Sequence, residues 1–203
     1  MKASGLIGCL MVLGMSTYAR ASEQRPEEST AELIRRGTTA EKTRRNADAI
    51  TAYEELLRRD TSFEAVVAPR LVNLYIDGGQ SAAALSWAAR VSCRQPDPKA
   101  YLAGVHARLG QWKESELILR QSLREEREPR KRLPLMWQLA DAQEGQGDGE
   151  SALATLAGAR DAAPDDRLRK TSAQRLNALH HRLDAAQTKQ PPTRGKPKAE
   201  DTP

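Results

Sequence analysis

The sequence is poor in the residues from which β-sheets and aromatic cores are built. Its 203 residues include one Phe, three Trp and four Tyr, and Val and Ile together supply only eleven residues. Alanine and leucine, both strong helix formers, supply 54 of the roughly 79 hydrophobic residues. This composition excludes a β-sandwich, a barrel and a doubly wound sheet, and it predicts an all-α protein.

Large aliphatic side chains are also scarce. Leu, Ile, Val and Phe sum to 35 residues, about 17% of the chain, below the roughly 20% at which a chain can be disordered. The excess of alanine must therefore be explained by disorder or by closely packed helices.

Cysteine is nearly absent, and one of the two cysteines, Cys9, lies in a segment typical of export signals. Lys2 precedes an apolar run over 5–15, and residues 19–21 read Ala-Arg-Ala, the small-x-small pattern of a cleavage site. We predict a signal peptide over 1–21, cleaved after Ala21, and a periplasmic or secreted protein. The run is shorter than the roughly 20 residues that span a bilayer. Lipidation at Cys9 is the alternative to plain cleavage.

The predicted mature chain has Cys93 alone, so it forms no internal disulfide. Its net charge falls from +5 to +3, and charges of both signs are interspersed. This pattern is typical of a solvated surface, so we expect no nucleic-acid partner and no transmembrane segment after signal removal.

Small residues recur where a second helix of a pair should begin. Their spacings are 35, 31 and 37 residues, an average of about 34. A turn signal precedes each of them, with glycine in the later three turns, and a proline follows twelve residues after two of them. The four residues are Ala49, Ala84, Ser115 and Ala152.

This pattern resembles the tetratricopeptide repeat (TPR) family, and the chain is identified as an exported bacterial member. The fourth unit matches best, through Leu139, Ala140, Gly147, Ala152, Leu156, Ala159 and Pro164. The first unit matches the family pattern least well. The resemblance implies a solenoid of four helical hairpins, with units at about 30–63, 64–97, 98–129 and 132–164. The small side chains would then let paired helices approach closely, which explains the alanine excess.

The ends of this array differ from the repeats. Leu168, Leu176, Leu179 and Leu183 share one face, which predicts a capping helix over 165–186, with its arginines on a wet outer side. Residues 22–26 are expected to be flexible, and the basic, proline-containing tail 187–203 to be disordered.

Catalytic or metal-binding patterns are not found. His106 is expected to be packed or half-exposed, and Cys93 to be a small buried residue. The glycine-rich stretch 145–149 joins two helices and is interpreted as a turn. We therefore expect a non-catalytic protein without cofactor or metal.

In the TPR family, first helices line a concave groove that holds a peptide or an extended partner segment. Positions carried over from the family predict a polar groove with aromatic anchors. The alternative is that its two aromatic residues only seal the core between repeats. The set comprises Asn73, Asp77, Tyr101, Arg108, Trp137, Asp141 and Glu144.

A basic stretch lies at the third-to-fourth connection, with a net charge of +3 over thirteen residues. It is interpreted as a solvated helix end, with weak contact to an anionic surface as the alternative. Its basic residues are Arg120, Arg124, Arg127, Arg130, Lys131 and Arg132.

The sequence thus predicts a periplasmic protein–protein interaction module, monomeric by itself. The alternative is an obligate accessory subunit of an envelope enzyme or of a secretion or assembly complex.

Overall fold

The computed structural model describes residues 28–188, and within this range every regular element is a helix. The predicted signal peptide over 1–21, the predicted flexible segment 22–26 and most of the predicted tail lie outside the described residues. The helices are α1 Thr30–Lys42, α2 Asn46–Arg59, the short 3-10 helix η1 Thr61–Phe63, α3 Glu64–Asp77, α4 Ser81–Ser92, α5 Pro98–Arg108, α6 Trp112–Glu125, α7 Pro129–Gly145, α8 Gly149–Asp161 and α9 Asp166–Thr188.

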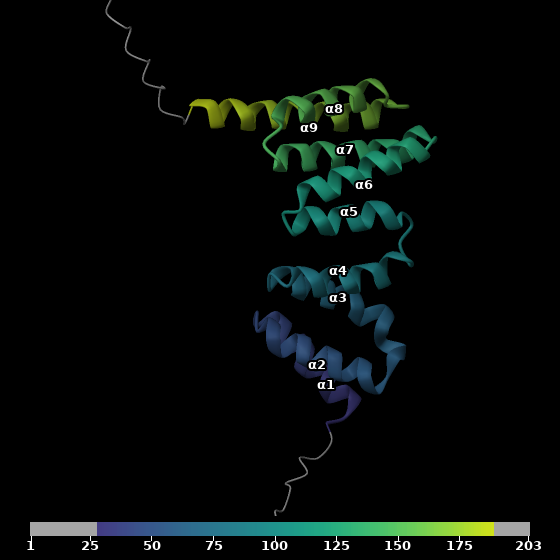
Figure 1. The fold of residues 1–203 in the computed structure, drawn as a ribbon, viewed down its shortest axis with the longest axis vertical. Coiled ribbons are helices and arrows are strands. Elements are labelled where there is room, and N and C mark those ends of the chain that lie inside the picture. Colours follow the sequence, from purple (N-terminus) through teal and green to yellow (C-terminus); the bar gives the residue numbers. More distant parts are fainter. Residues whose placement is uncertain (1–27, 189–203) are drawn as a thin grey trace, which may run out of the picture.

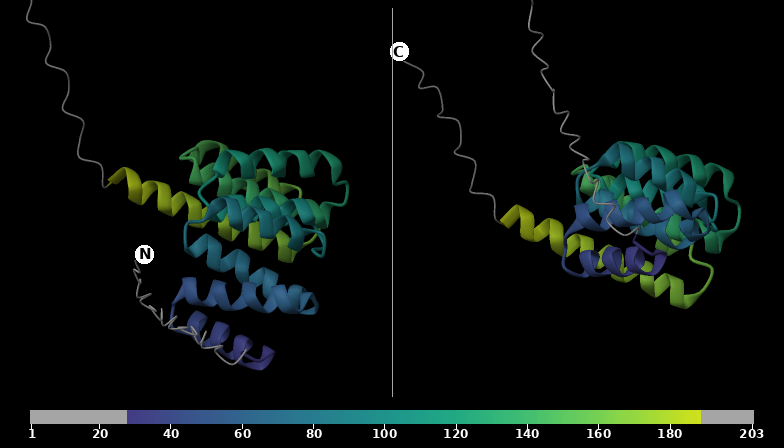
Figure 2. Two further views of the ribbon diagram at one scale, coloured as in Figure 1. Left: turned by 60° about the horizontal axis from the view of Figure 1, so that its bottom comes forward. Right: turned by 90° about the horizontal axis from the view of Figure 1, so that it is seen from below.

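The helices form packed pairs that follow one another in a row. Consecutive helices pack together as α1 with α2, α3 with α4, α5 with α6 and α7 with α8, and α9 packs on α8. The pairs succeed one another along the long axis of the molecule (Figure 1), and the C-terminal end of α9 extends beyond them (Figure 2). The all-α class and the paired helices are confirmed.

Three of the side-chain contacts between neighbouring pairs share one sequence separation. Three hydrogen bonds join residues that are 35 positions apart, each between the first helix of one pair and the next first helix or the residue that precedes it. α9 therefore takes the position of a first helix, and the described residues end with it. The three bonds join Asn73 with Arg108, Arg130 with Asp165 and Trp137 with Ser172.

Each turn inside a pair contains one residue with positive φ. Glycine occupies this place in three pairs, at Gly79 (φ 68°), Gly110 (φ 73°) and Gly147 (φ 83°). Without a Cβ, glycine adopts this conformation at little cost, which explains the turn signal in the sequence. In the first pair the same place is held by Arg44 with φ 56°. Arg44 therefore carries backbone strain that the other three turns avoid.

The small residues of the repeat pattern lie inside the pairs. All nine are buried, which confirms that small side chains stand where helices cross closely. At Gly37 in α1, for example, the backbone lies directly against the ring of Tyr53 in α2. The nine are Gly37, Ala49, Ala84, Ala103, Ser115, Ser122, Ala140, Ala152 and Ala159.

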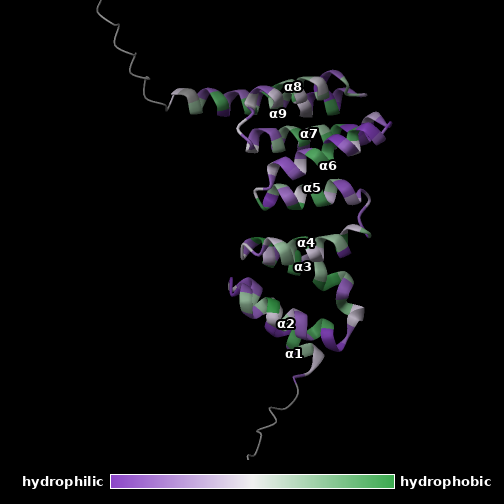
Figure 3. Ribbon diagram, viewed as in Figure 1, coloured by the Kyte–Doolittle hydropathy of each residue, from purple (hydrophilic) through white to green (hydrophobic). Residues whose placement is uncertain are grey.

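The apolar core is divided along the row rather than gathered in one centre. Separate clusters lie between α1, α2 and α3, between α3, α4 and α5, between α5, α6 and α7, and between α7, α8 and α9. Hydrophobic and hydrophilic residues alternate along each helix (Figure 3), as expected when every helix buries one side. The scarcity of large aliphatic residues therefore reflects a thin row of helices in this part of the chain.

The last helix of the described residues, α9, closes the C-terminal end of the row. Asp165 caps it by accepting a hydrogen bond from the Leu168 amide at 2.9 Å. Leu176 and Leu179 are buried against α7 and α8, and Leu183 packs beside them. The predicted apolar face is confirmed, and the helix continues two residues into the predicted tail, to Thr188.

Candidate binding groove on the first helices

Three of the predicted groove residues lie together where α3 meets α5. Arg108 donates a hydrogen bond from Nη1 to Oδ1 of Asn73 at 2.6 Å. Its Nη2 lies 3.9 Å from Oδ1 of Asp77. The Arg108 and Asp77 side chains are about half exposed, so this pair contributes roughly 0–1 kcal/mol to stability. Arg108 and Asp77 can therefore give up their contact with each other and bind a ligand at a small cost in free energy.

Tyr101, also on α5, does not join this cluster. Its half-buried ring packs against the apolar cluster formed by α3, α4 and α5. Burial raises the pKa of its hydroxyl, and nearby Arg108 opposes that shift. This position matches the alternative in which the aromatic residue seals the core between two pairs.

The predicted groove residues of α7 all contact α9. The indole N–H of Trp137 donates to Ser172 Oγ at 3.0 Å, and Ser172 is fully buried. Glu144 accepts two hydrogen bonds of 2.7 Å from Arg182, in the bidentate geometry that makes such pairs strong. Asp141 completes the set from the same helix.

Asp141 lies 3.6 Å from Arg175, whose guanidinium group also stacks over the Trp137 ring at 5.2 Å from its centroid. Partial burial raises the pKa of Asp141, although Arg175 acts in the opposite direction. Arg175 and Arg182 are about half exposed, in agreement with the expected wet side of the capping helix, and both also pair with carboxylates of α7. On α7, α9 thus occupies the place expected for a partner.

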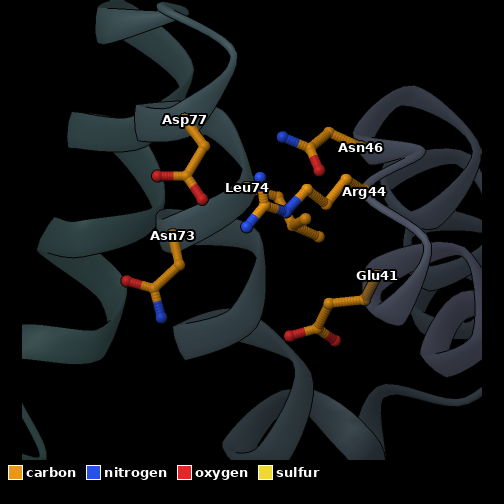
Figure 4. Close-up of a pocket in the computed structure, with 6 residues that line it drawn as sticks. All are labelled: Glu41, Arg44, Asn46, Asn73, Leu74 and Asp77. Carbon is orange, nitrogen blue, oxygen red and sulfur yellow. The ribbon is translucent and has the colours of Figure 1, made fainter.

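A pocket that the sequence did not predict lies between the turn of the first pair and α3. Its volume is about 420 Å³. Figure 4 shows side chains from the two sides facing each other across it. The lining residues are Glu41, Arg44, Asn46, Asn73, Leu74 and Asp77. Since Asn73 and Asp77 also contact Arg108, the pocket continues the polar cluster of α3 and α5.

Glu41 on the pocket wall is held by two donors. The Tyr53 hydroxyl and Arg70 Nη1 each donate to its Oε2 at 2.8 Å. Burial raises the pKa of Tyr53 to about 12, and the hydrogen bond to Glu41 adds to the shift. Tyr53 is 2% exposed, so its ring has little freedom to move and its hydroxyl holds the Glu41 carboxylate in place.

Above pH 10 we expect the protein to lose stability through Tyr53. The folded state keeps the hydroxyl proton up to about pH 12, whereas the unfolded chain releases it near pH 10. Between these values the unfolded state binds fewer protons, so stability falls as pH rises, by at most about 1.4 kcal/mol per pH unit. Tyr75, whose pKa is also about 12, adds a parallel loss.

Urea unfolding across this pH window measures the effect. Tyr53→Phe should reduce the slope of stability against pH by about half, because Tyr75 stays in both proteins. Identical slopes for the variant and the wild type would contradict the assignment to Tyr53.

Groups suited to catalysis are dispersed. Within residues 28–188 no three His, Cys, Asp or Glu side chains are arranged to hold a metal ion. His106 is half-buried as expected, with Nδ1 2.7 Å from Gln111 Oε1. The expectation of a buried Cys93 is wrong, because this residue caps the C-terminus of α4 and is exposed.

Among residues 28–188, no helix has the length and apolar character needed to traverse a bilayer.

The basic stretch between α6 and α7 is largely engaged by groups of the same chain. Arg120 pairs with Glu116 at 2.7 Å, Lys131 with Glu128 at 2.6 Å and Arg130 with Asp165 at 3.1 Å. Arg132 donates to the Leu123 and Glu126 carbonyl oxygens at the end of α6. These contacts favour the solvated helix end over an anionic-surface patch.

The arrangement therefore offers a cluster of polar binding groups around α3. Comparison with known proteins adds no family to this picture, because neither any protein-family model nor any curated protein matches the sequence.

Proposed function

We propose that this chain is a TPR-type protein that binds a segment of a partner protein without catalysis. The binding face is formed by Asn73, Asp77 and Arg108 of α3 and α5, together with the adjoining pocket. The observation that carries the proposal is the convergence of polar side chains from three helix pairs on one accessible place. Backbone amides of an extended segment require both donors and acceptors, and this face supplies both.

Two structural regularities support the TPR-type assignment. The positive-φ residues at 44, 79, 110 and 147 each precede the small anchor of the second helix by five positions, so turn and anchor keep one register through four pairs. The hydrogen bonds at a separation of 35 residues link the first helices of successive pairs, as in solenoids whose repeats contact only their neighbours.

The predicted export signal places the proposed activity in the cell envelope. We propose a periplasmic or secreted module that docks a larger assembly and is monomeric by itself. Size-exclusion chromatography of the purified mature chain distinguishes this role from the accessory-subunit alternative. An isolated chain that aggregates or unfolds would favour the alternative.

Site-specific photo-crosslinking in intact cells tests the binding face. A photoreactive amino acid at position 77 should capture a defined partner, and Asn73→Ala combined with Arg108→Ala should reduce that capture at least about tenfold, since hydrogen bonds to charged groups are lost. The matched control carries the same amino acid at Leu117 on α6, which is 70% exposed. Equal capture at both positions, or capture at position 77 that the double variant leaves unchanged, would reject this face.

A further inference from the structure

The pocket beside the first turn contains a guanidinium group that no carboxylate of the described chain neutralises. The neighbouring Arg45 pairs with Asp48 at 3.5 Å, whereas no carboxylate between residues 28 and 188 pairs with Arg44. Figure 4 shows the Arg44 side chain directed across the pocket towards the α3 wall. A guanidinium group presents five N–H donors in a fork that matches a carboxylate.

Arg44 reaches this place at a cost to the backbone. Its φ of 56° lies in the left-handed region, where Gly79, Gly110 and Gly147 stand in the other three pairs. A non-glycine residue in this conformation costs on the order of 1 kcal/mol or more. The strain accompanies a free cation in a cavity, and strained residues of this kind cluster at ligand sites.

Two amide groups add donors around the same cavity. Asn73 lines the pocket, and because Arg108 bonds to its Oδ1, its Nδ2 group is the end of the amide that Arg108 does not engage. Asn46, the first residue of α2, lines the pocket from the other side. Arg44, Asn46 and Asn73 together can donate to both oxygens of one carboxylate.

The charges around the pocket allow a single negative group. Glu41 is already held by Arg70, and Asp77 lies 3.9 Å from Arg108. Arg70 and Arg108 pair with these two carboxylates from outside the lining, so the positive charge of Arg44 is the one charge of the lining without a partner of opposite sign among the described residues. A monoanionic carboxylate matches it, whereas a phosphate dianion would meet the repulsion of the two wall carboxylates.

We infer that this pocket holds the carboxylate of a Glu or Asp side chain from the protein segment bound on α3 and α5. The inference rests on the proposed function for the nature of the ligand. Asn73 belongs both to the binding face and to the pocket. A segment bound on that face passes Asn73 and can therefore place one of its side chains in the pocket, while its two termini lie outside it.

NMR titration of the isotope-labelled protein with capped tripeptides tests the inference directly. Acetyl-Gly-Glu-Gly-amide should shift the side-chain N–H signals of Arg44, Asn46 and Asn73 in a saturable manner. Acetyl-Gly-Gln-Gly-amide should not shift them. Equal shifts with the Gln peptide, or saturable binding of acetyl-Gly-Lys-Gly-amide instead, would overturn the inference. Tighter binding of the phosphoserine analogue, or of an uncapped Gly-Gln-Gly through its terminal carboxylate, would overturn the assignment to an acidic side chain.

Arg44→Gly is the decisive variant because it removes the cation and leaves a residue that suits the turn. We expect its affinity for the Glu peptide to fall at least about tenfold while its melting temperature rises by a few degrees. Arg124→Gln removes an exposed arginine of α6 and should leave the affinity unchanged. Unchanged affinity in Arg44→Gly would reject the pocket as the site.

The titration and the crosslinking separate the two proposals. Capture at position 77 without Glu-peptide binding would reject the acidic ligand and keep the binding face. Glu-peptide binding without any captured partner would keep the pocket and reject the proposed face.

Discussion

Gly37→Ala is expected to destabilise the protein by about 3 kcal/mol, the upper part of the range for overpacking a core. A Cβ at this position would lie 2.5 Å from Cε1 and 2.8 Å from Cδ1 of Tyr53, closer than such atoms approach. The ring cannot easily move aside, because it is 2% exposed and its hydroxyl is bonded to Glu41. The steric conflict therefore outweighs the roughly 0.5–1 kcal/mol by which alanine favours a helix over glycine.

Thermal unfolding followed by circular dichroism measures this effect, with an expected fall in melting temperature of about 6–12 °C. Gly104→Ala in α5 is the matched control, since a Cβ there meets no atom within 4 Å. That variant should gain about 0.5–1 kcal/mol. Similar gains in both variants would show that α1 and α2 do not approach each other as closely as the structure indicates.

Leu179→Ala is expected to cost about 3 kcal/mol and to loosen α9 in particular. Leu179 is 1% exposed and packs with Ala140 of α7 and with Ala152 and Leu156 of α8. Truncating a buried leucine removes its transfer free energy and leaves a cavity, at a cost of about 2–5 kcal/mol. Urea unfolding gives the total, and hydrogen exchange should show faster exchange at amides of α9 than elsewhere.

Leu117→Ala on α6 makes the same chemical change at a side chain that is 70% exposed. Its effect should stay within about 0.5 kcal/mol, as for other surface substitutions. Equal losses in the two variants would mean that α9 is not held by this apolar contact.

Composition and spacing predicted the helix pairs because both are local properties of the chain. Gly79, Gly110 and Gly147 mark their turns in the sequence, and each has the positive φ that such a turn requires. The burial of the nine small residues follows from their spacing in the same way. The first turn was also predicted, but nothing in the sequence identifies Arg44 as the residue that takes the place of glycine there.

The candidate site was predicted less completely, because it depends on contacts between pairs. Positions taken from the family resemblance placed Asn73, Asp77 and Arg108 in what proved to be one cluster. The sequence did not indicate that Arg175 and Arg182 would cover the groove residues of α7. Both arginines are about half exposed, as a polar helix predicts, and only the side-by-side packing of α7 and α9 brings them to their partners.

The pocket could not be predicted at all, since it joins a turn of the first pair to the end of α3, and the first pair is the poorest match to the family. Cys93 was predicted to be buried near the end of α4, but it lies one residue beyond the end of that helix. Ser92 is the last residue of α4 and is buried, whereas Cys93 follows it as the cap.

The ion pairs between successive first helices have a mechanical consequence. Four of them, with side chains that are about one-third exposed or more, cross from one pair to the next on this side of the row. Added salt partly weakens such exposed ion pairs, whereas the apolar clusters between helices are not weakened in this way. We therefore expect the contacts on the first-helix side to loosen before the apolar clusters do as ionic strength rises. The four pairs are Arg70 with Glu41, Arg108 with Asp77, Arg130 with Asp165 and Arg175 with Asp141.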